Sequence, residues 1–121
     1  MPDNEDKAVA TFIANLAQQG IDAAVEGPSV VYSMVVVAGG LVGQTIPTAV
    51  SISELSAWPA VPPHWIHFPA SVKFVRTNPD PSDCLPGWLR HSREIGTWSA
   101  DQTPVVRWLA HVRGVVAEAS S

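Results

Sequence analysis

The chain has 121 residues, 46% of them hydrophobic and 15% charged, which is enough for one domain with its own core but not for two. Its formal net charge is −4, and its seven lysines and arginines form no dense run, which argues against a nucleic-acid-binding surface. The longest apolar run, residues 34–38, is far shorter than the roughly 20 residues that span a bilayer. We therefore expect one soluble domain over residues 1–121, with no nucleic acid and no membrane among its partners.

The cysteine content and the start of the chain bear on its compartment. Cys84 is the single cysteine, so no internal disulfide is available. The acidic start, residues 3–6, is the opposite of the basic and then apolar pattern of a secretory signal. Both observations favour a reducing cytoplasm.

Apolar residues recur at helical spacing near the N-terminus. Acidic residues precede them, as suits the start of a helix, and Gly20 follows as a stop signal. The spacing predicts a helix over about 4–18, with a buried face made of Val9, Phe12, Ile13 and Leu16.

From residue 30 to residue 52 the sequence changes to β-branched residues interrupted by glycines at 39, 40 and 43. This pattern predicts two antiparallel strands joined by a glycine turn, one over 30–38 and one that starts at 41 or 45 and ends at 52. Residues 65–68, which follow a proline-rich run, are a further short strand candidate. We expect a meander of three or four strands over about 22–75.

The remaining sequence predicts a long irregular loop and then a helix. Prolines and glycines are scattered through residues 69–97. Thr103 and Pro104 are typical of a helix start, and the helix should continue to about residue 118 and pack on the sheet. Its apolar face comprises Val105, Trp108, Leu109, Val112 and Val116, while Arg107 and Arg113 are expected to be solvated. The fold class is therefore α+β: N-terminal helix, antiparallel β-meander, long irregular loop and C-terminal helix.

The order of motifs in residues 58–116 resembles the core of the ubiquitin-conjugating enzymes, and so predicts a UBC-like fold. Trp58-Pro59 and Pro62-Pro63 precede a strand, an Asn- and Pro-containing stretch follows, and then Cys84-Leu85 and Trp98-Ser99 at the start of a helix. The run Gly87–Arg93 is similar to a diverged bacterial branch of that family, found beside ubiquitin-like, activating-enzyme-like and isopeptidase-like proteins. The resemblance covers the whole chain in layout and about half of it in motif.

This resemblance implies a thioester carrier with Cys84 as the nucleophile, a ubiquitin-like protein as its cargo and an activating-enzyme-like protein as its donor. In the family an Asn in a His-Pro-Asn motif stabilises the oxyanion, and Asn78 is the matching residue in Thr77-Asn78-Pro79. His91, seven residues after Cys84, could activate the thiol, although the Arg90–Arg93 cluster is equally interpreted as a solvated face or a partner contact. Asp83, together with Asp80, could tune an incoming amine.

No metal and no cofactor is expected. His64 and His67 have a His-x-x-His spacing, but in a strand residues three apart point to opposite faces, and no third ligand lies at a fitting distance. The glycines at 39–43 lack the Lys-Ser/Thr of a phosphate loop and are better interpreted as a hairpin turn.

Two functions of different class follow from the sequence. The first is the thioester carrier, and the second is a catalytically inactive UBC-like protein-binding module in which residues 76–97 form a docking surface. A third interpretation is an unrelated small α+β domain that serves as an oligomer subunit. An exposed Cys84 with an acidic thiol would favour the carrier.

Overall fold

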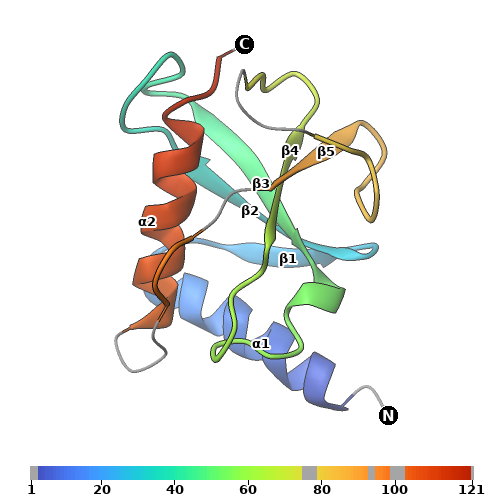
Figure 1. Ribbon diagram of the computed structural model, residues 1–121. Coiled ribbons are helices and arrows are strands. Elements are labelled where there is room, and N and C mark those ends of the chain that lie inside the picture. The colour runs from blue at the N-terminus through green and yellow to red at the C-terminus, as the bar shows by residue number, and fades with distance from the viewer. Residues whose placement is uncertain (1–2, 75–78, 93–94, 99–102, 121) are drawn as a thin grey trace.

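The computed structural model describes residues 3–74, 79–92, 95–98 and 103–120, and these residues form two helices and an antiparallel sheet (Figure 1). Helix α1 (Asp3–Gln18) is followed by the strands β1 (Ala23–Glu26), β2 (Ser29–Val35) and β3 (Thr45–Ser51), by the short 3-10 helix η1 (Ile52–Glu54), and then by β4 (Trp65–Pro69), β5 (Trp88–Ser92) and helix α2 (Pro104–Val116). The α+β class, with a helix before and after an antiparallel sheet, is confirmed.

Helix α1 forms where the apolar spacing predicts it and buries most of the predicted face, with Ile13 only partly buried. Phe12 and Leu16 are fully buried, and Val9 is buried beside them. The helix ends at Gln18, and Gly20 follows it with a φ of +77°, a left-handed conformation that glycine adopts without strain. The amide of Gly20 donates to the Ala17 carbonyl and that of Ile21 to the Leu16 carbonyl, so these two carbonyls in the last turn of the helix are satisfied.

The sheet is a simple meander in which each strand pairs with the next along the chain, in the order β1-β2-β3-β4-β5. The β2–β3 connection is the predicted glycine turn, closed by a bond from the Val36 amide to the Gln44 carbonyl. Between β3 and β4 the register pairs Ala49 with His67. Pro47 and Pro69 limit this ladder, because proline has no amide hydrogen to donate.

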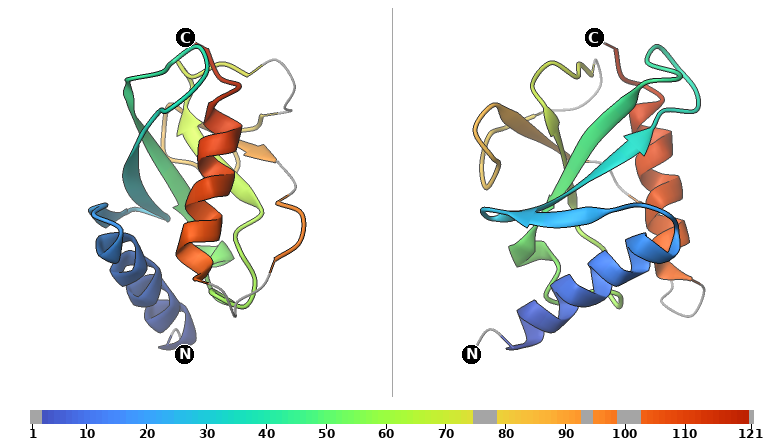
Figure 2. Two further views of the ribbon diagram at one scale, coloured as in Figure 1. Left: turned by 90° about the vertical axis from the view of Figure 1, so that its left-hand side faces the viewer. Right: turned by 180° about the vertical axis from the view of Figure 1, so that it is seen from behind.

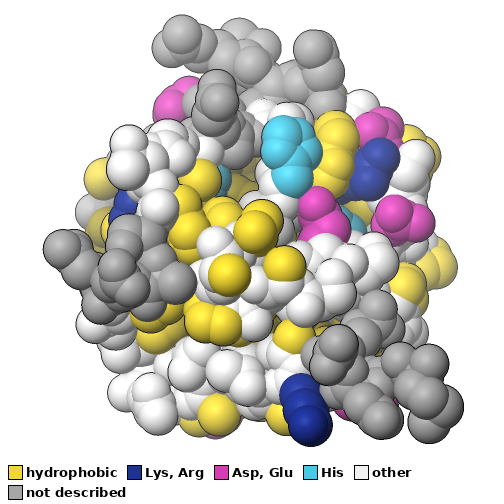
Figure 3. Space-filling model, turned by 60° about the horizontal axis from the view of Figure 1, so that its bottom comes forward, with side chains coloured by type: hydrophobic (Ala, Val, Ile, Leu, Met, Phe, Trp, Pro, Cys, Tyr) yellow, Lys and Arg dark blue, Asp and Glu magenta, His cyan; other side chains and the backbone are white. Residues whose placement is uncertain are grey.

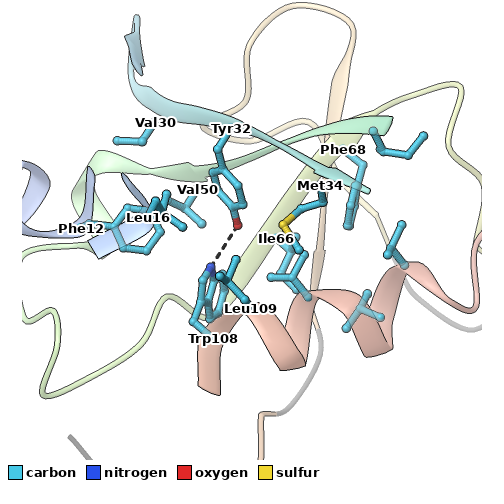
Figure 4. Close-up of a cluster of buried hydrophobic side chains, with 14 of the residues drawn as sticks. Phe12, Leu16, Val30, Tyr32, Met34, Val50, Ile66, Phe68, Trp108 and Leu109 are labelled. Carbon is cyan, nitrogen blue, oxygen red and sulfur yellow. Dashed lines mark hydrogen bonds between the residues drawn. The ribbon is translucent and has the colours of Figure 1, made fainter. Parts of the chain in front are cut away.

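Helix α2 lies along one face of the sheet (Figures 1 and 2). Buried hydrophobic side chains of the helix and of the sheet pack against one another between them (Figure 4). Its buried face contains every residue that the sequence predicted, with Val115 in addition. Trp108 is fully buried and donates its indole N–H to the Tyr32 hydroxyl at 3.0 Å, which joins the helix to β2 (Figure 4). Helix α1 crosses one end of the molecule near β1 and η1.

Two predictions about the second half of the chain were wrong. Residues 88–92, predicted to belong to an irregular loop, form β5, which pairs with β4 over its whole length. The strand is short and mostly polar, so it lacks the β-branched signal of a strand. Arg107, predicted to be solvated, is half-buried because its guanidinium donates to the Ile95 carbonyl, whereas Arg113 is exposed as predicted.

Candidate functional site

Cys84 lies in a tight turn in the loop that leads to β5. Asp80 begins this loop by pairing with Arg90: the Asp80 amide bonds to the Arg90 carbonyl at 3.2 Å and the Arg90 amide to the Asp80 carbonyl at 2.8 Å. The Cys84 amide then bonds back to the Pro81 carbonyl at 3.2 Å. Asp83 has a φ of 59°, a left-handed conformation that Asp tolerates better than most residues. The turn therefore places Asp80, Asp83 and Cys84 close together beside Arg90.

Arg90 is the centre of these contacts. Its Nε donates to Oδ1 of Asp80 at 2.9 Å, and its Nη1 lies 3.6 Å from Oδ2 of Asp83. The guanidinium carbon lies 4.1 Å above the Trp65 ring, within cation–π range. We call Trp65, Asp80, Asp83, Cys84 and Arg90 the Arg90 cluster.

The environment of Cys84 favours the neutral thiol. The side chain is half-buried, and its Sγ lies 3.9 Å from the Asp80 carbonyl oxygen, which accepts from the S–H. Burial raises the pKa of the Cys84 thiol to about 11; the charge of Arg90 lowers it, but the carboxylates of Asp80 and Asp83 raise it again. At neutral pH only about one thiol in ten thousand would be ionised. A nucleophilic cysteine needs the opposite setting, because the thiolate is the reactive form.

His91 does not lie beside Cys84. Side chains alternate between the two faces of a strand, so Arg90 and His91 point to opposite sides of β5. The His91 ring is buried in the core, with its centroid 4.5 Å from that of Phe74 and 5.8 Å from that of Phe68. Burial also lowers the pKa of His91. The interpretation of His91 as an activator of Cys84 in a loop therefore does not fit its place in the fold.

The other two predicted site residues have different outcomes. Asp83 is brought next to Cys84, but its largely exposed carboxylate faces Arg90, and no amine-binding geometry is defined by this pair. Asn78, the predicted oxyanion donor, lies outside the described residues. Of the predicted set, the structure thus brings together Cys84 and Asp83 and separates them from His91.

His67 is a buried titratable residue that sequence reasoning considered only as a metal ligand. It lies in β4 between Ala49 and Arg90 and is fully buried. Neither of its ring nitrogens has a hydrogen-bond partner among the described residues. Burial, and then the charge of Arg90, lowers the pKa of His67 to about 4, so the ring is neutral at pH 7. The near-continuous apolar character of residues 65–69 was a sequence signal for this burial.

The two histidines of the His-x-x-His spacing lie in different surroundings. The His64 ring nitrogen Nε2 lies 2.8 Å from the Ser92 hydroxyl, whereas His67 is buried in the sheet. Across the described part of the chain, no group of three or more His, Cys, Asp or Glu side chains is arranged to hold a metal ion. On the face drawn in Figure 3, basic side chains are few and lie apart, and acidic ones lie beside one of them.

Within the described residues, no helix has both the length and the apolar character needed to cross a membrane. Comparison of the chain with protein-family models, with curated proteins and with solved structures gave no match.

Proposed function

We propose that this chain is a protein-binding module with a UBC-like fold, in which Cys84 does not carry a thioester. The proposal rests on one observation: the Cys84 thiol is half-buried, bonds to a backbone carbonyl and has a pKa raised to about 11. The nearby cation, Arg90, is already engaged by Asp80, Asp83 and Trp65. A carrier would need a thiolate that attacks the donor thioester and displaces the thiol of the activating enzyme.

The Arg90 cluster offers features suited to binding rather than chemistry. Asp83 is the most exposed member, and Asp80 is partly exposed, so the loop beside β5 presents negative charge to solvent. Paired backbone groups at Asp80 and Arg90 hold this surface in place. The partner proposed from the sequence resemblance is a ubiquitin-like protein or its activating enzyme, in the cytoplasm. A basic patch on that partner would complement the acidic loop.

A charging reaction tests the proposal. The chain is mixed with an activating enzyme that already carries its ubiquitin-like protein, and the products are analysed by mass spectrometry with and without a reducing agent. We expect no adduct on Cys84, and binding of equal strength for the parent and Cys84→Ala. A reducible adduct located on Cys84, absent from Cys84→Ala, would establish the carrier and overturn the module.

The same samples test where the partner binds. Asp83→Asn keeps a residue that tolerates the left-handed backbone but removes the exposed charge. Loss of one exposed charge pair should weaken binding by about two- to fivefold. Lys7→Gln, a charge change on the exposed surface of α1, is the matched control and should leave the affinity unchanged.

A further inference from the structure

The end of β2 lacks a neighbour on one side. β1 pairs with β2 only between Ala23↔Tyr32 and Glu26↔Ser29, whereas β2 continues to Val35. In the right-hand view of Figure 2, β1 and β2 diverge towards the start of β1. We call the edge of residues 33–37 on this side the β2 overhang.

The backbone of the overhang has hydrogen-bonding groups that face away from the sheet. The Val36 amide bonds to the Gln44 carbonyl, and the Val36 carbonyl accepts from the Gly43 amide, both at 2.8 Å. Successive residues of a strand direct these groups to opposite sides, so those of Val35 and Val37 point away from β3. Within the described chain, Val37 makes no backbone hydrogen bond. Unpaired groups of this kind are a template for another strand.

A groove of about 470 Å³ lies along this edge. One wall is the segment of residues 19–22 that joins α1 to β1, another is the overhang itself, and Arg113 of α2 completes the lining. Val35, at the end of β2, and Val37, just after it, are 56% and 63% exposed, which is unusual for valine. Arg113 is exposed and makes no ion pair with any described residue.

We propose that the β2 overhang is a strand-addition site for an extended peptide of a partner protein, and that a carboxylate of this peptide binds Arg113. The added strand would bond to the backbone of Val35 and Val37 and place β-branched side chains next to these valines. Native edges are usually protected by lysine, proline or a bulge, and residues 33–37 contain neither lysine nor proline. Because Asp22 also lines the groove, one carboxylate near Arg113 fits better than a strongly acidic segment.

This site goes beyond the function proposed above and does not depend on it. In the sheet, β3 and β4 separate β2 from β5, which carries Arg90. The state of the Cys84 thiol therefore has no bearing on strand addition, and either proposal can fail while the other stands.

A defined peptide tests the site. The probe is the fluorescein-labelled hexapeptide Thr-Val-Thr-Val-Thr-Glu, titrated with the full chain and followed by fluorescence anisotropy and by amide NMR shifts. We expect a Kd below about 1 mM, with shifts at residues 33–37 and 19–22. No binding at that concentration, or shifts confined to another surface such as β5, would overturn the proposal.

Two N-methylated versions of the probe test the backbone bonds directly. In one the first, third and fifth amides are methylated, and in the other the second, fourth and sixth. A strand added to one edge uses only one of these sets, so one version should bind at least about tenfold more weakly than the other. Equal binding of both versions would contradict strand addition, and this comparison does not depend on any variant of the protein.

Substitutions of groove residues test the same site by their effect on binding of the probe. Val35→Pro removes an N–H that points away from β3, so the fold should persist while probe binding weakens by at least about tenfold. Arg113→Gln should weaken binding of the Glu-ended probe by about two- to fivefold but leave an amidated Gln-ended probe unaffected. Lys7→Gln, outside the groove, is the control. A groove variant that binds as well as the parent would count against the proposal.

Discussion

At the scale of single residues, Arg90 determines the chemistry of the loop beside it. Its guanidinium is held by Asp80 and Asp83 and lies over Trp65, so it acts on Cys84 only through its charge. The sequence identified Cys84 and Asp83 as neighbours, since they are adjacent in the chain. It could not show that Arg90 binds Asp80, because that contact depends on a backbone pairing across a turn of irregular shape.

The raised pKa of Cys84 leads to a prediction about its reactivity. The rate of alkylation by iodoacetamide should rise with pH and reach half of its maximum near pH 11, because only the thiolate reacts. At pH 7 the rate should be far below that of a free thiol, whose pKa is about 8.5. Mass spectrometry of samples quenched across the pH range measures this. A midpoint at or below pH 8 would show a reactive thiol.

His67 should make the fold sensitive to mild acid. Its pKa in the folded chain is about 4, below the ordinary 6.5, so the unfolded chain binds a proton first as the pH falls. The contribution of neutral His67 to the free energy of unfolding is therefore fully present above pH 6.5, and it is lost as the pH falls from 6.5 to 4. We expect a loss of about 2 kcal/mol between pH 7.5 and 5, measured by urea unfolding.

The charges of Arg90, Asp80, Asp83 and His91 also influence the pKa of His67. Two variants therefore test whether the pH dependence of stability comes from His67 itself. His67→Phe replaces an unpartnered buried ring by an apolar one and should remove most of this pH dependence. His64→Gln changes an exposed histidine and should keep it. If His67→Phe loses stability in acid as much as the parent does, His67 is not the group that titrates.

At the scale of elements, the sequence predicted best those that bury a periodic face. Both helices lie close to their predicted bounds, because apolar side chains at 3.6-residue spacing leave few alternatives. The predicted meander over 22–75 contains β1 to β4. β5 was not predicted because its sequence is mostly polar. It forms a strand because it pairs with β4.

The buried face of α2 gives a stability prediction. Trp108→Ala should lower the free energy of unfolding by about 3–5 kcal/mol, because it leaves a large cavity between α2 and β2. It would also leave the Tyr32 hydroxyl without its partner. Arg113→Ala, an exposed change on the same helix, should stay within about 0.5 kcal/mol of the parent. Chemical denaturation of both variants measures this, and similar stabilities would mean that Trp108 is not a core residue.

At the scale of the whole molecule, the segment after α2 connects parts that are distant in the sequence. The Lys73 amide bonds to the Ser120 carbonyl at 2.7 Å, and the Ser120 amide bonds to the Lys73 carbonyl at 2.9 Å. On its other side, this segment packs against the β2–β3 turn so closely that a Cβ on Gly39 would lie 1.9 Å from the Ala117 carbonyl oxygen. No local pattern in the sequence indicates this close approach.

Two glycines of the β2–β3 turn form a matched pair for testing this close contact with the segment after α2. Gly39 and Gly43 have φ values of +91° and +89°, so replacing either with alanine puts a side chain at the same unfavourable φ. A Cβ on Gly43 would meet nothing within 4 Å. Gly43→Ala should therefore cost about 1 kcal/mol, and Gly39→Ala several kcal/mol more, measured as free energies of unfolding. If the two variants lose the same free energy of unfolding, the backbone at Ala117 can move away from the new Cβ without destabilising the fold.

The complete burial of Tyr32 beneath α2 also gives the chain an optical property. Tyr32 is the single tyrosine, and its burial raises the pKa of the phenol well above 10. The folded chain therefore cannot form tyrosinate at a pH where the unfolded chain does, and stability falls as the pH rises above about 10. Ultraviolet absorbance of tyrosinate in alkaline solution consequently comes from unfolded molecules alone, so an unlabelled sample reports its own denaturation.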